Sequence, residues 1–320
     1  MNNFAPVIIP TLNRYQHFKR CVESLSKCSH SDRTDLFIFL DYPLNETHWE
    51  GYNNIKKYIQ IIHGFKSINL IERQKNYGAL KNYQELLREM FEKYEKIIFT
   101  EDDNIFSPNF LEYMNNGLIK FEGNKKISAI CAYNYPIIMP NDFITNYYRY
   151  RGFSAWGFAT WRNRFEEVVY TKEMMIEFSR HSDFIVEMKK ISERHLFNLA
   201  TSILTNNEKY GDFTIFLNNI RKDQYCIFPI LSKVKNYGND GTGVHCGSLQ
   251  EKLFTNQSID ELSTFEFIDS KFNEILEFNN LLKHYFKMTI KQKIFYPMII
   301  TILKCYLMIK PNRIEKQNNY

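Results

Sequence analysis

Three consecutive acids end a short apolar run in the stretch IIFTEDDNIFSP, residues 97–108. They are Glu101, Asp102 and Asp103. Like charges at this spacing repel one another, and burial raises their free energy further. The triplet therefore indicates either a solvated turn or a site that holds a positive group. Mg²⁺ and Mn²⁺ prefer carboxylate oxygens and take further ligands from phosphates, so the second alternative is a metal–diphosphate site in which the metal stabilises a leaving diphosphate.

The elements that would position these acids alternate along the first hundred residues. Short apolar runs predict strands, and segments with apolar residues on one helical face predict helices. The predicted strands are 6–10, 35–41, 68–73 and 96–103, and the predicted helices between them are 14–28, 49–63 and 79–94. Strands that alternate with helices at this spacing are typical of right-handed βαβ units and a mostly parallel sheet.

Polar residues follow each of the four predicted strands. They are PTLNR (10–14), Asp41, RQKNYGALKN (73–82) and the acidic triplet. In parallel sheets the ligand lies outside the carboxyl ends of the strands, where these four stretches would meet. The sequence therefore predicts a nucleotide pocket at this edge.

The second half of the chain is less regular. Residues 126–134 predict a strand, 150–165 a loop that enters a strand, 172–205 mainly helix, and 224–246 a strand followed by a glycine-rich loop. Neither a repeat nor a low-complexity linker divides this part. We predict one α/β domain over residues 1–250 and a helical extension over 251–320.

Composition excludes some classes of protein. The chain has 320 residues, of which 44% are hydrophobic and 16% aromatic, as in a globular protein. Its net charge of +5 is concentrated in residues 278–314, which hold seven basic residues and no acid. The remainder is slightly acidic, so we expect no nucleic-acid partner. The N-terminus has no signal-peptide pattern, and the six cysteines form no CxxC pair, so we expect mostly buried thiols in a reducing cytoplasm.

Several stretches, in order, resemble the GT-A glycosyltransferases. They are PVIIPTLNR, Asp41, RQKNYGALKN, FTEDDNIFSPNFLEYM, GFSAWGFATWRNRF and KVKNYGNDGTGVH, within residues 4–246. The chain is most similar to family 2-type enzymes of bacterial surface polysaccharides, lipopolysaccharide among them, and to the EDD subgroup around N-acetylglucosaminyltransferase I. The resemblance implies a GT-A fold, a Rossmann-like nucleotide-diphospho-sugar transferase, with a mostly parallel central sheet.

The resemblance also implies roles for single residues. Asp103 would hold Mn²⁺ or Mg²⁺, with His245 approaching the metal or the diphosphate. Asp41 would accept a hydrogen bond from the base, as expected for uracil. The other residues implied to bind the nucleotide-sugar are Pro10, Thr11, Asn13, Arg14, Arg73, Asn76, Gly78, Glu101, Asp102, Trp156 and Gly157.

Each role has a structural alternative. Asp41 could be a turn or cap residue, and Arg73 could form a surface ion pair. Gly78 could merely permit the turn into the next helix, which would still suit phosphate binding at the helix start. Trp156 could be a core aromatic residue, and His245 a solvated loop residue.

Inverting sugar transfer also needs a carboxylate that takes the proton of the acceptor hydroxyl. In the N-acetylglucosaminyltransferase-like enzymes this acid precedes an aromatic residue, and NEKYGDFTIF (207–216) offers Asp212 before Phe213. The tryptophan-rich form of that motif is absent. Asp212 is the candidate base, Glu208 is the reserve, and the alternative for Asp212 is a helix N-cap.

The C-terminal region is apolar between lysines. The run from Ile294 to Ile309 has 16 residues and contains Pro297 and Lys304, which is short of the ~20 residues of a membrane-spanning helix. We expect either a terminal helix packed on the domain or peripheral membrane contact through residues 283–313, at the inner face of the cell membrane.

Together these patterns predict a metal-dependent glycosyltransferase. It would move a hexosyl or N-acetylhexosaminyl group from a nucleotide-sugar donor, most simply a UDP-sugar, to a glycan or a lipid-linked glycan acceptor. Two alternatives remain open. A sugar nucleotidylyltransferase would carry a glycine-rich loop after the first strand, and PTLNRYQ has no glycine. A non-catalytic glycan-binding or scaffold protein on a degenerate GT-A fold would bind nucleotide without turnover.

Overall fold

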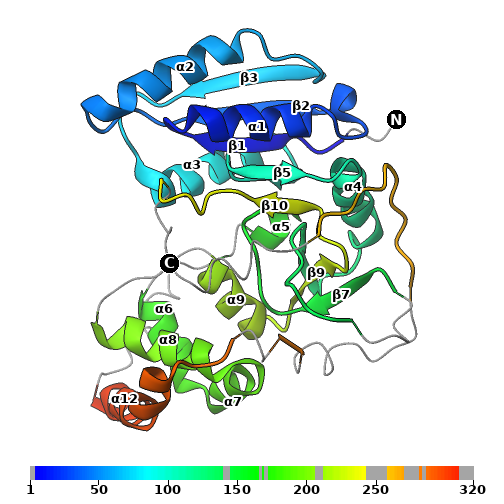
Figure 1. The fold of residues 1–320 in the computed structure, drawn as a ribbon. Helices are drawn as coiled ribbons and strands as arrows, with labels where there is room; N and C mark the ends of the chain where they lie inside the picture. The colour runs from blue at the N-terminus through cyan, green and yellow to red at the C-terminus, as the bar shows by residue number, and fades with distance from the viewer. Residues whose placement is uncertain are drawn as a thin grey trace, which may run out of the picture.

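The computed structural model describes residues 4–139, 145–165, 168, 172–205, 212–242, 258–269, 281–282 and 286–309. An eight-stranded sheet in the order β3-β2-β1-β4-β8-β6-β9-β7 forms its centre (Figure 1). Its strands are β1 (Val7–Thr11), β2 (Asp35–Leu40), β3 (Ser67–Glu72), β4 (Lys96–Phe99), β6 (Ile127–Cys131), β7 (Tyr147–Tyr150), β8 (Phe158–Trp161) and β9 (Tyr225–Pro229).

The first four strands are parallel, as the alternating pattern predicts. β1 lies between β2 and β4 and β2 pairs with β3, all in parallel register. The connecting helices are α1 (Tyr15–Leu25), α2 (Trp49–Ile59) and α3 (Gly78–Lys93). α1 buries Phe18, Cys21, Val22 and Leu25 on one face, because these residues recur at helical spacing. The prediction of an α/β fold with a mostly parallel sheet is confirmed.

The second half adds an antiparallel part to the sheet. β8 runs antiparallel to both β4 and β6, β9 is parallel to β6, and β7 closes the edge antiparallel to β9. The helices of this half are α4 (Phe110–Lys120), α5 (Arg162–Phe165), α6 (Lys172–Arg180), α7 (Ser182–Ile191), α8 (Glu193–Thr205), α9 (Asp212–Arg221) and α12 (Ile290–Ile309). β8 places residues 152–157 beside the end of β4, which brings the two halves together at the predicted edge.

A second, two-stranded sheet crosses that edge. β5 (Asn104–Phe106) directly follows the acidic triplet and pairs antiparallel with β10 (Val234–Asn236). Segment 258–269 then runs against α4, where Phe265 and Phe267 pack on Tyr113. Lys233 and Asp260 form a buried ion pair beneath it. The division at residue 250 stays a prediction.

The cysteines of the described residues are free thiols. Cys21, Cys28, Cys131 and Cys226 are buried, whereas Cys305 is exposed. The expectation of mostly buried thiols is confirmed for these five, and Cys246 lies outside the described residues. Burial raises the pKa of Cys28 to about 12, so its thiol stays protonated and unreactive.

Candidate active site

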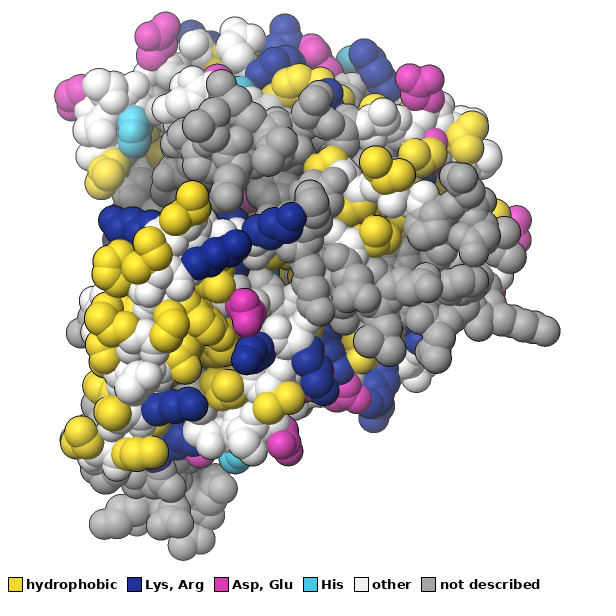
Figure 2. Space-filling model, turned by 60° about the horizontal axis from the view of Figure 1, so that its bottom comes forward, with side chains coloured by type: hydrophobic (Ala, Val, Ile, Leu, Met, Phe, Trp, Pro, Cys, Tyr) yellow, Lys and Arg dark blue, Asp and Glu magenta, His cyan; other side chains and the backbone are white. Residues whose placement is uncertain are grey.

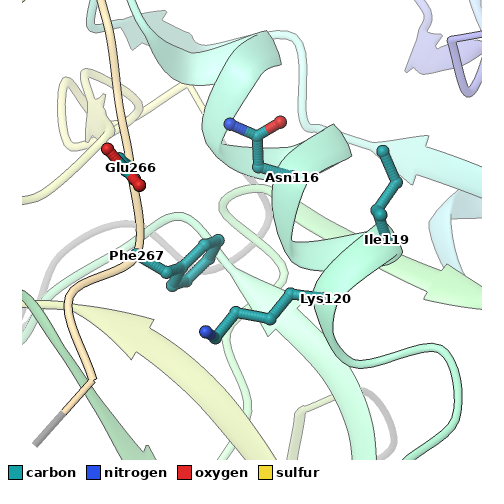
Figure 3. Close-up of a pocket in the computed structure, with 5 residues that line it drawn as sticks. All are labelled: Asn116, Ile119, Lys120, Glu266 and Phe267. Carbon is teal, nitrogen blue, oxygen red and sulfur yellow. The ribbon is translucent and has the colours of Figure 1, made fainter.

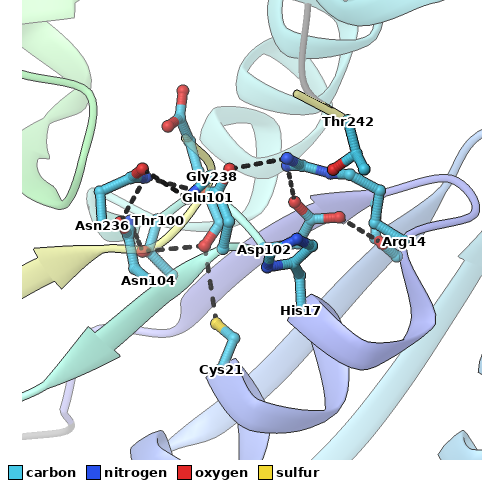
Figure 4. Close-up of polar contacts among 12 residues, drawn as sticks. Arg14, His17, Cys21, Thr100, Glu101, Asp102, Asn104, Asn236, Gly238 and Thr242 are labelled. Atoms are coloured by element: carbon cyan, nitrogen blue, oxygen red, sulfur yellow. Dashed lines mark hydrogen bonds and ion pairs between the residues drawn. The ribbon is translucent and has the colours of Figure 1, made fainter. Parts of the chain in front are cut away.

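The acids that follow β4 surround an arginine from the first βα connection. Arg14 pairs with the carboxylates of Asp102 and Asp103 through its two terminal nitrogens, the contact to Asp103 measuring 2.8 Å (Figure 4). Thr11, at the end of β1, donates a hydrogen bond of 2.7 Å to the second oxygen of Asp102. β1 and β4 are neighbours in the sheet, so their carboxyl ends bring these groups together. The positive group among the acids is therefore the guanidinium of Arg14, a side chain of the protein itself.

One guanidinium does not balance this cluster. Burial by itself lowers the pKa of Arg14, but Asp102 and Asp103 outweigh it and raise the pKa, so Arg14 remains charged. Burial is also the main cause of the raised pKa of Asp102, despite the pairing with Arg14. The pKa of Glu101 is raised well above its ordinary value by burial and then by the charges of Asp103, Asp212 and Asp102. Three carboxyl groups, those of Glu101, Asp102 and Asp103, thus interact with the single charge of Arg14, and the site favours a further positive charge.

Asp103 is held by the segment that contains β10. Its Oδ1 accepts a hydrogen bond of 2.6 Å from Asn236 Nδ2, and its backbone carbonyl accepts one of 2.9 Å from the Tyr237 amide. Gly238 lies against the carboxylate, because a Cβ at this position would stand 2.2 Å from Asp103 Oδ2. Asn236 also donates to Asn104 Oδ1 at 2.9 Å. The sequence identified the KVKNYGND stretch but not the role of Asn236, because nothing local shows that β10 pairs with β5.

These surroundings fit a hard divalent cation. Mg²⁺ commonly binds through one or two carboxylates together with waters and substrate phosphates, rather than in an all-protein cage. Asp103 supplies two carboxylate oxygens, of which Oδ1 accepts from Asn236 and Oδ2 pairs with Arg14 beside the close-packed backbone of Gly238. Within the described residues, no group of three or more His, Cys, Asp and Glu side chains forms a metal cage. The metal role of Asp103 stays a prediction, and His245 lies outside the described residues.

Asp41 connects the end of β2 to the start of α3. Its Oδ1 accepts hydrogen bonds of 2.9 Å from the amides of Tyr42 and Tyr77, and its Oδ2 accepts one of 2.9 Å from Gly78. Gly78 has a φ of 72°, which favours glycine. Asn76 donates to the Tyr42 carbonyl at 2.6 Å. The cap alternative for Asp41 thus has direct geometric support, while its contact with a base stays a prediction.

Arg73 is not on the surface. It is buried at the end of β3, where its Nε donates to Asn82 at 2.9 Å and its Nη1 pairs with Glu89 at 2.5 Å. Its guanidinium also lies over the ring of Tyr77, at 5.0 Å from the centroid. Arg73 therefore fixes α3 against the sheet edge. The alternative of a surface ion pair is wrong in its location, because Arg73 does form an ion pair but is buried.

The loop before β8 forms the other side of the acids. Asn104 donates a hydrogen bond of 2.8 Å to the Trp156 carbonyl, and the Trp156 ring meets Tyr133 edge-on with centroids 4.7 Å apart. Gly157 has a φ of 138°, and a Cβ there would stand 3.1 Å from Ala132 Cβ. On the opposite side, Pro10, Asn13 and Arg14 are partly accessible at the end of β1. The nucleotide-sugar contacts of these residues stay predictions.

Asp212, the candidate base, lies at the start of α9 beside that loop. Its Oδ2 accepts a hydrogen bond of 3.2 Å from the Ala155 amide, and its charge acts on Glu101. The side chain of Asp212 is exposed at the surface. The protein packed around it nevertheless disfavours the charged carboxylate, and this desolvation raises the pKa of Asp212 from 3.8 to about 7. A carboxylate with a pKa near the working pH is suited to general base catalysis. The structure therefore places Asp212 with the acidic triplet, while the reserve residue Glu208 lies outside the described residues.

A loop from the C-terminal side contacts helix α1. His17 Nε2 lies 2.7 Å from Asp240 Oδ2, and His17 Nδ1 lies 2.9 Å from Arg20. Thr242, two residues further, donates hydrogen bonds of 3.0 and 2.7 Å to Asp240 Oδ1 from its amide and its hydroxyl. Sequence reasoning missed His17 and Asp240, because a helical histidine and a loop aspartate carry no signal of contact across 223 positions.

A cavity elsewhere in the described structure carries no comparable chemistry. It has a volume of about 280 Å³ and lies between α4 and segment 258–269, lined by Asn116, Ile119, Lys120, Glu266 and Phe267 (Figure 3). Its lining contains one acid and one base, so it lacks the charge density of the site around Arg14.

Replacing Arg14 by alanine should destabilise the protein by about 3 kcal/mol at pH 7, since it leaves buried carboxylates without their counter-ion. Urea denaturation measures the change. Arg88 supplies the matched control, because it pairs with Glu85 and Glu92 on the surface. The Arg88→Ala variant should unfold at nearly the wild-type urea concentration. Equal effects of the two substitutions would show that the acids do not depend on Arg14.

Comparison with known proteins agrees with the fold. The geometry described is that of an α/β protein with a cluster of acidic side chains at the carboxyl edge of its sheet. Residues 7–182 match Glycosyl transferase family 2, which is more than half of the chain, and the chain belongs to this family. No curated protein matches the chain in sequence.

Solved structures with similar folds are distant in sequence. A mannosyltransferase from Pyrobaculum calidifontis, solved with GDP-Man and Mn²⁺, is 11% identical, with a TM-score of 0.39 over 70% of this chain and 69% of that one. TarS of S. aureus is 12% identical, with a TM-score of 0.35 over 52% of this chain and 30% of that one. A shorter form of TarS, solved with UDP-GlcNAc, has a TM-score of 0.35 and is covered over 48% of its length.

Proposed function

We propose that this family 2 protein is a metal-dependent glycosyltransferase that uses a nucleotide-diphosphate sugar, most simply a UDP-sugar. The supporting observation is the arrangement at the sheet edge, where Asp103 and Asp102 face Arg14 and Asp212 lies close enough to act on Glu101. A diphosphate bound there would meet the positive charge of Arg14, and a divalent ion would carry the charge that Arg14 leaves unbalanced. The family favours this function over a sugar nucleotidylyltransferase.

The residues divide the chemistry between them. When bound at Asp103, the metal supplies charge stabilisation for the departing diphosphate. Asn236 and Gly238 fix the Asp103 carboxylate, so its position is set before the donor binds. Asp212 removes the proton from the acceptor hydroxyl while the oxygen of that hydroxyl attacks the anomeric carbon. This direct displacement predicts inversion at that carbon. Likeness to the EDD subgroup, with a glycan or lipid-linked glycan as acceptor, belongs to this proposal.

Calorimetric titration of UDP, GDP and CMP into the purified protein tests the donor. We expect one nucleotide to bind only with Mn²⁺ present, and this binding to be lost in the Asp103→Ala variant. The base of that nucleotide names the donor. If no nucleotide binds with or without Mn²⁺, the proposal is wrong. Tight nucleotide binding without transfer to any acceptor would favour the non-catalytic scaffold instead.

A further inference from the structure

Helix α12 presents apolar side chains on two opposite faces. One face packs on the domain: Leu303 is buried, and Tyr296, Ile299, Ile300 and Leu307 are partly buried against the core. α12 lies along α8 and α6, and the pKa of Tyr296 is raised by burial and by the nearby Glu193 of α8. Because residues three and four apart share a helix face, these positions form one continuous stripe.

The opposite face of α12 is uncovered in the described structure. Ile294, Met298 and Ile302 follow one another at intervals of four residues and are 67%, 50% and 44% exposed. Phe295, Met308 and Ile309 extend the same surface. Figure 2 shows yellow side chains gathered over this end of the molecule, with lysine and arginine side chains along their margin. An exposed apolar face of this size on a soluble domain indicates a surface that meets something apolar.

The charges on and beside α12 indicate what kind of surface covers its exposed face. Lys287, Lys291, Lys293 and Lys304 are exposed on or beside α12, and no acid occurs between residues 278 and 314. Lys293 and Lys304 are separated by about three helical turns and so lie on one side of the helix, between its docked and its exposed apolar faces. Apolar side chains bordered by lysines match the interface of a bilayer that contains anionic lipids, where lysine stems lie along the acyl boundary and ammonium groups reach the phosphates.

The helix is longer than the sequence analysis anticipated. It has 20 residues, and an 18-residue window within it has a mean hydropathy of 1.3, which meets the length and composition of a membrane span. Spanning would, however, strip Tyr296, Ile299, Ile300 and Leu303 from α8 and α6. A helix that lies flat on the membrane, with its outer face in lipid, keeps these contacts. It also avoids placing the charge of Lys304 and the helix-breaking Pro297 inside the bilayer.

We propose that α12 docks the enzyme on an anionic membrane surface through the face formed by Ile294, Met298 and Ile302, without spanning the bilayer. This inference rests on α12 alone and not on the proposed transfer reaction. It would place the domain, held by α8 and α6, at the membrane surface, where a lipid-linked acceptor is found.

Flotation of the full-length protein with vesicles tests the proposal. Wild-type protein should float with vesicles of equimolar phosphatidylglycerol and phosphatidylcholine, and less with phosphatidylcholine alone. The double variant Ile294→Asp/Ile302→Asp should bind at least about tenfold more weakly, because two apolar side chains lose their burial in lipid. Ile61→Asp is the matched control, since Ile61 is 71% exposed beyond α2 at the opposite end of the molecule (Figure 1), and it should float as the wild type does.

Charge variants test the lipid preference separately. Lys293→Glu/Lys304→Glu should remove the preference for anionic vesicles, whereas Lys57→Glu on α2 should leave it. Wild-type protein that floats with neither vesicle would overturn the proposal. So would retention of the protein in cell membranes after alkaline carbonate washing, which shows a spanning helix. A lipid-free dimer that Ile294→Asp dissociates would assign this face to a second copy of the chain and would also overturn it.

Discussion

An Asp103→Asn variant should transfer sugar at least about 100-fold more slowly than the wild type while keeping its fold. The exchange removes the negative charge that would hold the divalent ion. It keeps an oxygen that can accept the hydrogen bond from Asn236, and Arg14 keeps its pairing with Asp102. We therefore expect the loss to appear in turnover and in Mn²⁺ affinity, measured by donor-consumption assays and calorimetry, with little change in melting temperature.

The matched control is Asp223→Asn. Asp223 is an exposed aspartate that pairs with Lys126 and Arg151, so the chemical change is the same at a surface site. This variant should retain nearly full activity. If Asp103→Asn were equally active and bound Mn²⁺ as the wild type does, Asp103 would have no metal role.

An Asp212→Asn variant should lower kcat by about 10²- to 10⁴-fold, the usual contribution of a positioned general base. The wild-type rate should depend on pH in a particular direction. Because the pKa of Asp212 is raised to about 7 and a base must be unprotonated, kcat should rise with pH up to about 7 and level off above it. The variant should lose this rise, which a pH–rate profile with saturating donor and acceptor would show.

The Glu101→Gln variant tests whether Glu101 or Asp212 is the group that causes this pH dependence. If Glu101 only borders the site, its amide variant should keep the inflection of the wild-type profile. An inflection that disappears in Glu101→Gln but persists in Asp212→Asn would move the role of base to Glu101.

The same pKa gives Asp212→Asn an expected effect on stability. A carboxyl group whose pKa is higher in the folded protein than in the unfolded chain binds more protons when folded. Between about pH 4 and 7 its contribution to stability therefore falls as pH rises. Asp212→Asn removes this dependence, so at pH 8 its melting temperature should not lie below that of the wild type. A marked loss of stability at pH 8 would point to a structural role, such as the cap on α9.

The sequence by itself determined the layered first half of the fold. Strand and helix periodicities are local. The apolar runs of β1, β2 and β4 are short, mostly buried and bounded by polar residues, whereas that of β3 is half-buried. Parallel strands with helical connections must place their carboxyl ends at one edge. For that reason Thr11, Arg14, Asp41 and the acidic triplet could be assigned to one site without knowledge of the structure.

Contacts between distant segments were decided only by the tertiary structure. β10 reaches the triplet through its antiparallel pairing with β5, which brings Asn236 and Gly238 to Asp103 across more than 130 positions. The docking of α12 on α8 leaves one apolar face inside and one outside, a difference that composition cannot reveal because both faces are equally hydrophobic. Long-range pairing depends on how complete surfaces fit, whereas a sequence pattern reports only which face of an element is apolar.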